Sequence, residues 1–213
     1  MKITKYPQSC LKIEINNTVL VIDPGNLVTS EDFRNALEGA DAILITHEHA
    51  DHADPELIRR LSVGIKTIVS NKSAQDLLGK DLVNIVVVDG QEFKVKNVSI
   101  KAIELPHFQI NGKPAPLNTG YLIEGNFFHP GDSFESVLAV DSGAAVIAGP
   151  DAINMKLDQR IFNYVEQTKL KNVIPIHNDS SFYHNDTKIV GETLITKLGV
   201  NFIDLENGSS VEI

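Results

Sequence analysis

Tryptophan is absent from this sequence, and cysteine occurs once, as Cys10. A single cysteine excludes an internal disulfide framework and is consistent with a reducing compartment. Long apolar runs are also missing, because no stretch approaches the roughly 18 apolar residues of a membrane span. The opening MKITKYPQSCLKIEI alternates polar and apolar side chains, without the apolar core of a signal peptide. We therefore expect neither export nor membrane insertion, and we expect a cytoplasmic protein.

Positive charge is scarce as well. The 19 lysine and arginine residues face 28 aspartate and glutamate residues, which gives a formal net charge of -9. The chain thus lacks the overall basic character with which proteins bind phosphate backbones. We expect no nucleic-acid partner, although net charge leaves the distribution of charge open. A small-molecule substrate is the partner we expect, and a homo-oligomer stays open.

Length and composition indicate one folded unit. The chain has 213 residues, of which 42% are hydrophobic and 22% are charged. This composition is ordinary for a globular protein, and the length allows a substantial core. Because no low-complexity segment or linker interrupts the sequence, we predict a single domain over residues 1–213.

The apolar periodicity predicts two β-rich halves, each completed by helices. Strands are expected at 10–15, 18–23, 42–46, 66–70, 84–89, 92–97, 98–105, 119–125, 126–130, 144–150, 172–177 and 201–206. Asn16-Asn17 is expected to form a tight turn between the first two strands. Helices are expected at 30–40, 54–61, 73–80, 158–170 and 186–199. Such a pattern most simply packs as two sheets facing each other with helices outside.

Local signals mark some boundaries in this pattern. Ser30 is a candidate helix cap. Asp54 followed by Pro55 is a strong helix start, because aspartate caps the first turn and proline suits the first helical position. The polar, proline-bearing stretch FQINGKPAPLN at 108–118 is the best candidate for a mobile surface loop.

The most specific feature is THEHADH at residues 46–52, which follows the apolar run DAILI. Imidazole and carboxylate groups are ligands for zinc and related divalent ions. His47 and His49 are two positions apart, so in extended backbone both side chains leave on the same side. Asp51 and His52 continue the turn and can face a second point, so one segment could serve two metal ions. The zincin pattern differs, because it needs histidines four apart on a helix.

Four ligands in one loop cannot complete two metal shells, and three further residues stand in comparable places. His107 follows VSIKAIELP, Asp132 follows NFFHP, and His177 ends NVIPIH. Each comes at the end of an expected buried strand, which would put all three on one rim of the sandwich. For any one of them alone, a hydrogen-bonded structural role is the commoner interpretation.

Taken together, HEHADH, then His107, then FFHPGDSF with Asp132, then IPIH with His177 resemble the metallo-β-lactamase superfamily. The order of SCLKIEINNTVLVIDPG, FFHPGDSF and AGPDAINMKLDQ is similar to its small metal-dependent hydrolase branch, which includes ascorbate-6-phosphate lactonase-like proteins. The resemblance covers nearly the whole chain. It implies an α/β (α+β) fold, a four-layer αβ/βα sandwich with two facing mixed sheets and helices outside.

The resemblance also implies a dinuclear metal centre. One ion would be held by His47, His49 and His107, the other by Asp51, His52 and His177, and both by a bridging Asp132. The ions would be zinc, although mixed histidine and aspartate sites also accept manganese and iron. The chain departs from the branch at Gln8, where a histidine is usual, and in the FQING segment after His107. Both departures fall near the expected substrate entrance.

Two ions so placed would hold a bridging water as hydroxide and clamp the attacked oxygen. Asp51 is then the expected catalytic residue, which orients the hydroxide and passes its proton to the leaving group. We expect hydrolysis of a small ester, lactone, amide or phosphate-containing metabolite. A phosphodiesterase or nuclease of the same superfamily and a non-catalytic metal-binding protein are the alternatives.

Three other residues have weaker cases. Asp23, in VIDPG, could fix a ligand imidazole or hydrogen-bond within its own turn. His129, three residues before Asp132, could contact substrate, although a supporting or structural role is commoner. His184 could reach the site from the loop after His177, or it could begin a surface helix.

Overall fold

The computed structural model describes residues 1–65, 67–108, 115–135, 138–147, 159–179 and 184–213, which form two seven-stranded sheets. The first sheet has the order β14-β1-β2-β3-β4-β5-β6. Its strands are β1 (Lys2–Lys5), β2 (Leu11–Ile15), β3 (Thr18–Ile22), β4 (Ala42–Ile45), β5 (Thr67–Ser70), β6 (Ile85–Val86) and β14 (Ser210–Glu212). The second sheet has the order β13-β12-β11-β10-β9-β8-β7. Its strands are β7 (Glu92–Val95), β8 (Val98–Pro106), β9 (Leu117–Ile123), β10 (Phe127–His129), β11 (Ser142–Val146), β12 (Asn172–Ile176) and β13 (Asn201–Phe202).

Helices lie between the parallel strands, which need a crossover connection. In the first sheet the helices are α1 (Glu31–Leu37), α2 (Pro55–Leu61) and α3 (Lys72–Leu78), which separate β3, β4, β5 and β6. In the second sheet α4 (Gln159–Thr168) and α5 (His184–Leu198) separate β11, β12 and β13. The antiparallel pair β2 and β3 is joined instead by Asn16 and Asn17, with φ of 48° and 57°. Positive φ at both central residues is what a two-residue hairpin needs, so the predicted turn is confirmed.

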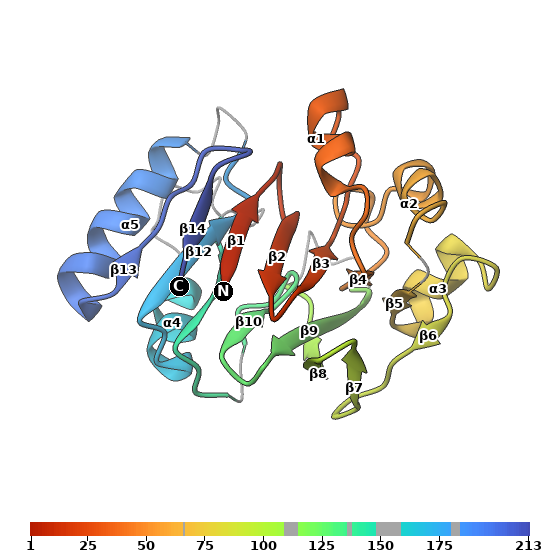
Figure 1. The fold of residues 1–213 in the computed structure, drawn as a ribbon. Coiled ribbons are helices and arrows are strands. Elements are labelled where there is room, and N and C mark those ends of the chain that lie inside the picture. The colour runs from red at the N-terminus through yellow and green to blue at the C-terminus, as the bar shows by residue number, and fades with distance from the viewer. Residues whose placement is uncertain (66, 109–114, 136–137, 148–158, 180–183) are drawn as a thin grey trace.

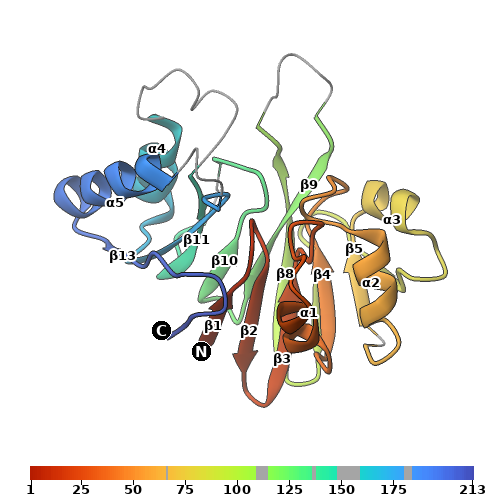
Figure 2. The same ribbon diagram turned by 90° about the horizontal axis from the view of Figure 1, so that it is seen from above.

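Side-chain alternation along the strands separates the layers. In β3 and β4, Leu20, Ile22 and Leu44 belong to the core shared with the second sheet. Their neighbours Ile43 and Ile45 face the other way and pack with buried residues of α2 and α3. Figures 1 and 2 show α1, α2 and α3 on one side of the molecule and α4 and α5 on the opposite side. The expected arrangement of two facing sheets with helices outside is therefore confirmed.

Some elements differ from the sequence-based expectation. The pattern does not predict β1 and β14, which pair with each other antiparallel, with Lys2 opposite Glu212. Such pairing joins the two ends of the described chain, so no local pattern reveals it. The edge strands β6 and β13 have two residues each, shorter than expected. Helix α3 begins at Lys72 because the side chain of Asn71 caps it by accepting from the Ala74 amide.

The loop expected at 108–118 lies only partly within the described residues. Phe108 is buried, and Leu117 is the first residue of β9. Residues 109–114 lie outside the described part of the chain, as does AGPDAINMKLDQ except for its final glutamine.

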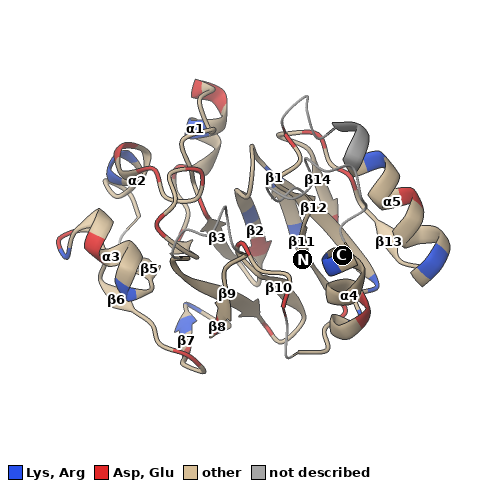
Figure 3. Cartoon of the chain, turned by 180° about the vertical axis from the view of Figure 1, so that it is seen from behind, with Lys and Arg blue, Asp and Glu red and all other residues tan. Residues whose placement is uncertain are grey.

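Charges of both signs are interspersed over the helices, as Figure 3 shows. Arg60 of α2, for example, pairs with Glu31 and Glu38 at 2.7 and 3.1 Å. Among the described residues, no helix is both long and apolar enough to span a membrane. The single domain over residues 1–213 stays a prediction.

Asp54 and Ser30 offer a matched test of helix capping. The Asp54 side chain accepts a hydrogen bond from the Glu56 amide at 3.0 Å, whereas Ser30 has the same position at α1 without a side-chain cap bond. Asp54→Ala should lower the free energy of unfolding by about 1 kcal/mol, and Ser30→Ala should change it much less. Urea unfolding measures both, and equal losses in the two variants would contradict this expectation.

Candidate metal centre

The predicted ligand segments meet at one rim of the two sheets. The loop at 46–52 follows β4, His107 follows β8, Asp132 follows β10, and His177 follows β12. The candidate ligand atoms form two groups, each with all its atoms within 4.8 Å of one another: His47, His49, His107 and Asp132, and Asp51, His52 and His177. Asp132 belongs to the first of these groups, and the other members are the same residues as in the two ligand sets that the sequence resemblance implies.

Asp132 lies between the two groups, and each of its carboxylate oxygens faces one of them. Oδ2 is 3.4 Å from His107 Nε2 and 3.9 Å from His47 Nε2. Oδ1 is 2.8 Å from His177 Nε2 and 3.2 Å from His52 Nε2. A carboxylate in this position can bridge two cations, with one on each oxygen.

Oxygen atoms behind three of the rings fix which ring nitrogen points into the centre. They are Thr46 Oγ1, 3.0 Å from His47 Nδ1, Asp23 Oδ2, 2.8 Å from His52 Nδ1, and the Phe108 carbonyl oxygen, 2.5 Å from His107 Nδ1. When Nδ1–H donates to these oxygens, Nε2 is the nitrogen left to face the centre. This is how proteins commonly orient histidine ligands.

The donor atoms fit divalent metal ions. His107 Nε2 and Asp132 Oδ1 are buried, and none of their contacts among the described residues has the geometry of a hydrogen bond, although buried polar atoms are normally paired. His52 Nε2 faces His177 Nε2 at 2.9 Å, and His47 Nε2 faces His49 Nδ1 at 3.1 Å. Two facing ring nitrogens need a proton or a cation between them. Imidazole nitrogen and carboxylate oxygen are the donors that zinc and related ions accept.

Electrostatic coupling within the centre runs through Asp132. Burial acts to raise the pKa of Asp132, but His177 and His52 outweigh it and hold that pKa well below its usual range. Burial acts to lower the pKa of His52, but Asp132 and Asp23 raise it well above its ordinary value. The pKa of His47 lies well below its ordinary value because of burial and the neighbouring His52. Asp132 and Asp23 therefore favour positive charge at this point of the centre, which a metal ion would supply.

Asp23 supports the centre from behind the ligand loop. Its fully buried carboxylate accepts hydrogen bonds from the Thr46 amide at 2.8 Å, from Thr46 Oγ1 at 2.7 Å and from His52 Nδ1 at 2.8 Å. Asp23 follows β3 with a φ of 50°, a conformation that a residue with a β-carbon rarely adopts. Of the two roles considered for Asp23, this arrangement matches the orientation of a ligand imidazole.

Sequence reasoning missed two asparagines that hold the ligand loops. Asn71 Nδ2 donates to the carbonyl oxygens of Thr46 and Leu117, both at 2.8 Å. Asn118 Oδ1 accepts from the Asp132 amide at 3.0 Å. Asn71 directly follows β5 at the same rim, so the strand-end signal that singles out the ligands could have found it. Asparagine is too common after strands for that signal to be specific.

Gly25 shows how closely the VIDPG turn packs against the ligand loop. A Cβ at this position would lie 1.9 Å from the carbonyl oxygen of Asp51. Next to it, the Asn26 amide donates to the Ala50 carbonyl oxygen at 2.8 Å. Only glycine fits here, because any side chain would displace the loop that carries the candidate ligands.

Of the two remaining histidines, His129 does not join the centre. His129 is fully buried, its Nε2 donates to the Ser9 carbonyl oxygen at 3.0 Å, and its Nδ1 accepts from the Gly131 amide at 3.2 Å. Both ring nitrogens are therefore engaged by backbone, which gives His129 a structural role and leaves neither for substrate. His184 is the first residue of α5, and its side chain lies outside the described part.

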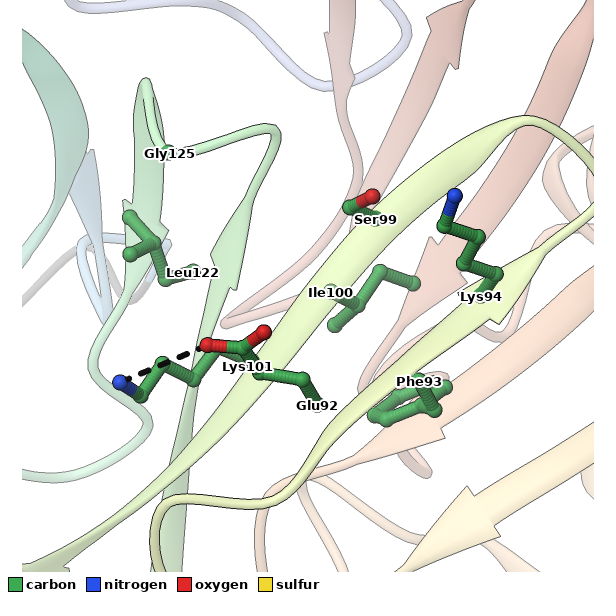
Figure 4. A pocket seen from close by; sticks show the side chains of 8 residues that line it. All are labelled: Glu92, Phe93, Lys94, Ser99, Ile100, Lys101, Leu122 and Gly125. Carbon is green, nitrogen blue, oxygen red and sulfur yellow. Dashed lines mark ion pairs between the residues drawn. The ribbon is translucent and has the colours of Figure 1, made fainter.

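A pocket of about 300 Å³ over β7, β8 and β9 is separate from this centre (Figure 4). Phe93, Ile100 and Leu122 line it, together with the pair Glu92 and Lys101, whose charged atoms are 3.7 Å apart. None of the seven candidate ligands is among its described lining residues. The chemistry of the metal centre therefore does not extend to this pocket.

The fold and the centre define a class of protein: a two-sheet sandwich with a histidine- and aspartate-rich centre where strands of both sheets end. A family model described as a beta-lactamase superfamily domain matches residues 2–177. Protein Rv0786c of Mycobacterium tuberculosis is 30% identical over 193 residues, which cover 83% of this chain and 84% of that protein. The chain belongs to the beta-lactamase superfamily.

Two further proteins resemble this chain, one in sequence and one in fold. A UPF0173 metal-dependent hydrolase of Cereibacter sphaeroides is 24% identical over 202 residues, which cover 83% of this chain and 85% of that protein. The solved structure of Igni18, a metallo hydrolase from Ignicoccus hospitalis, matches with a TM-score of 0.76 and 21% identity, over 99% of this chain and 97% of that one. The likeness of the structures confirms the predicted sandwich fold.

Asp23→Ala should destabilise the protein and weaken metal binding. The substitution leaves the buried Thr46 amide and the Nδ1–H of His52 without their acceptor, which should cost about 3–5 kcal/mol of unfolding free energy. Loss of the partner that orients a ligand should lower metal affinity by about 10- to 100-fold. Urea unfolding of metal-free protein and zinc titration measure the two effects.

The control is Asp32→Ala, because Asp32 is an exposed aspartate in the first turn of α1. This substitution should leave metal affinity unchanged and should change the free energy of unfolding very little. If Asp23→Ala behaved like this control in both measurements, the supporting role of Asp23 would be wrong.

Proposed function

We propose that this protein is a metal-dependent hydrolase that holds two divalent metal ions. The observation that carries the proposal is the buried carboxylate of Asp132, whose two oxygens face two separate groups of ligand atoms. The unpaired Nε2 of His107 supports it, as does the metal-dependent hydrolase name of the Cereibacter sphaeroides relative. Zinc is the metal we propose, although manganese and iron accept the same ligands.

The proposed ligands divide between two ions that share Asp132. One ion is held by His47, His49 and His107, and the other by Asp51, His52 and His177. Ions bound there supply a water molecule of lowered pKa as nucleophile and stabilise the charge that develops on the attacked carbonyl or phosphoryl oxygen. No serine or cysteine nucleophile is then needed.

Asp51 is the proposed catalytic residue. Its side chain is 31% exposed, compared with 0% for His52 and 9% for His177. Its Oδ2 lies 3.9 Å from Nε2 of each of these histidines. It can therefore contact both the metal-binding side and an approaching substrate. In this place it accepts a proton from the nucleophile and passes that proton to the leaving group.

A small molecule is the proposed substrate. A cavity of about 680 Å³ borders His107, and its lining includes Leu105, Pro116, Leu117 and Asn118. Both its volume and its mixture of apolar and polar groups suit a small metabolite. We infer an ester, lactone, amide or phosphate-containing compound as the substrate class.

A phosphodiesterase or nuclease is the second candidate, but the net charge of -9 and the interspersed charges in Figure 3 give it no support. A non-catalytic metal-binding protein is the third. Seven candidate ligand side chains converge at this centre, whereas a relative without turnover would often have lost some of them.

Metal uptake and turnover test the proposal together. Chelator-stripped protein titrated with zinc should take up two ions per chain, and the loaded protein should hydrolyse at least one member of a panel of small esters, lactones, amides and phosphate esters. His107→Ala and His177→Ala should each weaken binding of one ion. Asp51→Asn should weaken the second ion and, at saturating zinc, lower kcat by about 100- to 10,000-fold, because it removes a carboxylate that both binds the ion and transfers the proton.

Asp76→Ala, at an exposed aspartate of α3, is the control and should retain both ions and full turnover. Binding of two ions without turnover of any substrate would favour the metal-binding protein. Absence of stoichiometric metal uptake would refute the proposal.

A further inference from the structure

Gln8 contacts a candidate ligand from each of two separate loops. Its Nε2 lies 3.1 Å from Asp51 Oδ2 and 3.0 Å from His177 Nδ1. Asp51 belongs to the loop after β4 in the first sheet, whereas His177 follows β12 in the second sheet. A single carboxamide therefore joins loops of the two sheets at the second group of ligands.

The backbone of Gln8 is itself fixed by several contacts. Its amide donates to Asp179 Oδ2, and its carbonyl oxygen accepts from the His177 amide at 3.2 Å. Asp179 also forms an ion pair with Lys5 Nζ at 3.0 Å, and the Lys5 side chain is only 1% exposed. Asn207 Nδ2 donates to Asp179 Oδ1 at 2.7 Å. The Lys5–Asp179 pair thus holds Gln8 against the segment that carries His177.

The backbone conformation of Gln8 is strained. Its φ is 67°, in the left-handed region that residues with a β-carbon rarely adopt, and His177 has a φ of 63°. Asparagine and glycine enter this region more easily than glutamine does. Such strain persists only where the surroundings hold it, and it gathers at functional sites. A glutamine here therefore indicates that its side chain is needed.

We propose that Gln8 is a positioning residue, whose carboxamide holds Asp51 and His177 in the arrangement in which the second group of ligands binds a metal ion. The inference rests on the proposed function, because it needs a second ion. The amide nitrogen donates one proton to the Asp51 carboxylate and one to the imidazole nitrogen. These bonds hold the metal-free site. An ion on Nε2 of His177 leaves the proton of that ring on Nδ1, to which the amide can offer its oxygen only after a half-turn that gives up the bond to Asp51.

Gln8→Asn separates this role from a structural one. Asparagine keeps the amide and suits positive φ, so the unfolding temperature of the metal-free protein should stay the same or rise. Its side chain is one methylene shorter, so it cannot bridge Asp51 and His177. Affinity for one of the two zinc ions should fall by about 10- to 100-fold, while affinity for the other stays unchanged. Calorimetric zinc titration and thermal unfolding of the metal-free protein measure these quantities.

Double variants identify the affected ion. In the His177→Ala background, where the second ion is already weakened, Gln8→Asn should have little further effect on zinc affinity. In the His107→Ala background, the full effect of Gln8→Asn should persist, because His107 belongs to the other group. Gln8→Ala should weaken the same ion as Gln8→Asn does. Gln167→Ala, at an exposed glutamine of α4, is the control and should bind both ions as the wild type does.

The outcomes separate this inference from the proposed function. If the wild type binds two ions and Gln8→Asn binds both with unchanged affinity, the positioning role is wrong and the hydrolase proposal stands. The positioning role is also wrong if both ions weaken equally, or if the unfolding temperature falls together with affinity. If the wild type binds only one ion, the two-metal proposal fails, and this inference fails with it.

Discussion

The burial of the Asp132 carboxylate is the constraint on which the metal centre depends. An ionised carboxylate that is nearly removed from water is costly unless opposite charge and hydrogen-bond donors surround it. Here the surrounding groups are imidazoles that arrive from three different strand ends, those of His52, His107 and His177. The charge can be balanced only if these strand ends are held at fixed positions relative to one another. Polar contacts around the centre hold the strand ends in these positions.

Most of those contacts fix loops rather than ligands directly. Asp23 binds Thr46 and His52, so the loop after β4 is anchored to the end of β3. Asn118 binds the Asp132 amide, which anchors the turn after β10 to β9. Three residues beside the centre, Gln8, Asp23 and His177, have positive φ although none is glycine. The fold thus accepts local backbone strain where side chains must converge, and the rigid sheets hold that strain in place.

Membership of the beta-lactamase superfamily explains why the centre lies where the strands end, but it does not identify the substrate. In Igni18 the same sandwich is kept at 21% identity, so the two-sheet frame tolerates extensive change in sequence. A fold of this kind hosts different chemistries, because function depends on the side chains and loops around the site. In this chain the side chains around the site include Gln8 and the residues that line the cavity beside His107.

The sequence by itself determined the features that depend on near neighbours. The apolar pattern predicted the strands at 18–23 and 42–46, and Asp54-Pro55 predicted the start of α2, because these signals act within a few residues. The HEHADH loop was visible as a ligand segment for the same reason. Only the tertiary structure decided that β14 pairs with β1, that Lys5 meets Asp179, and that Gln8 reaches both Asp51 and His177. Each of these contacts joins residues far apart in the chain, so the packing of the two sheets, and no local pattern, selects the partner.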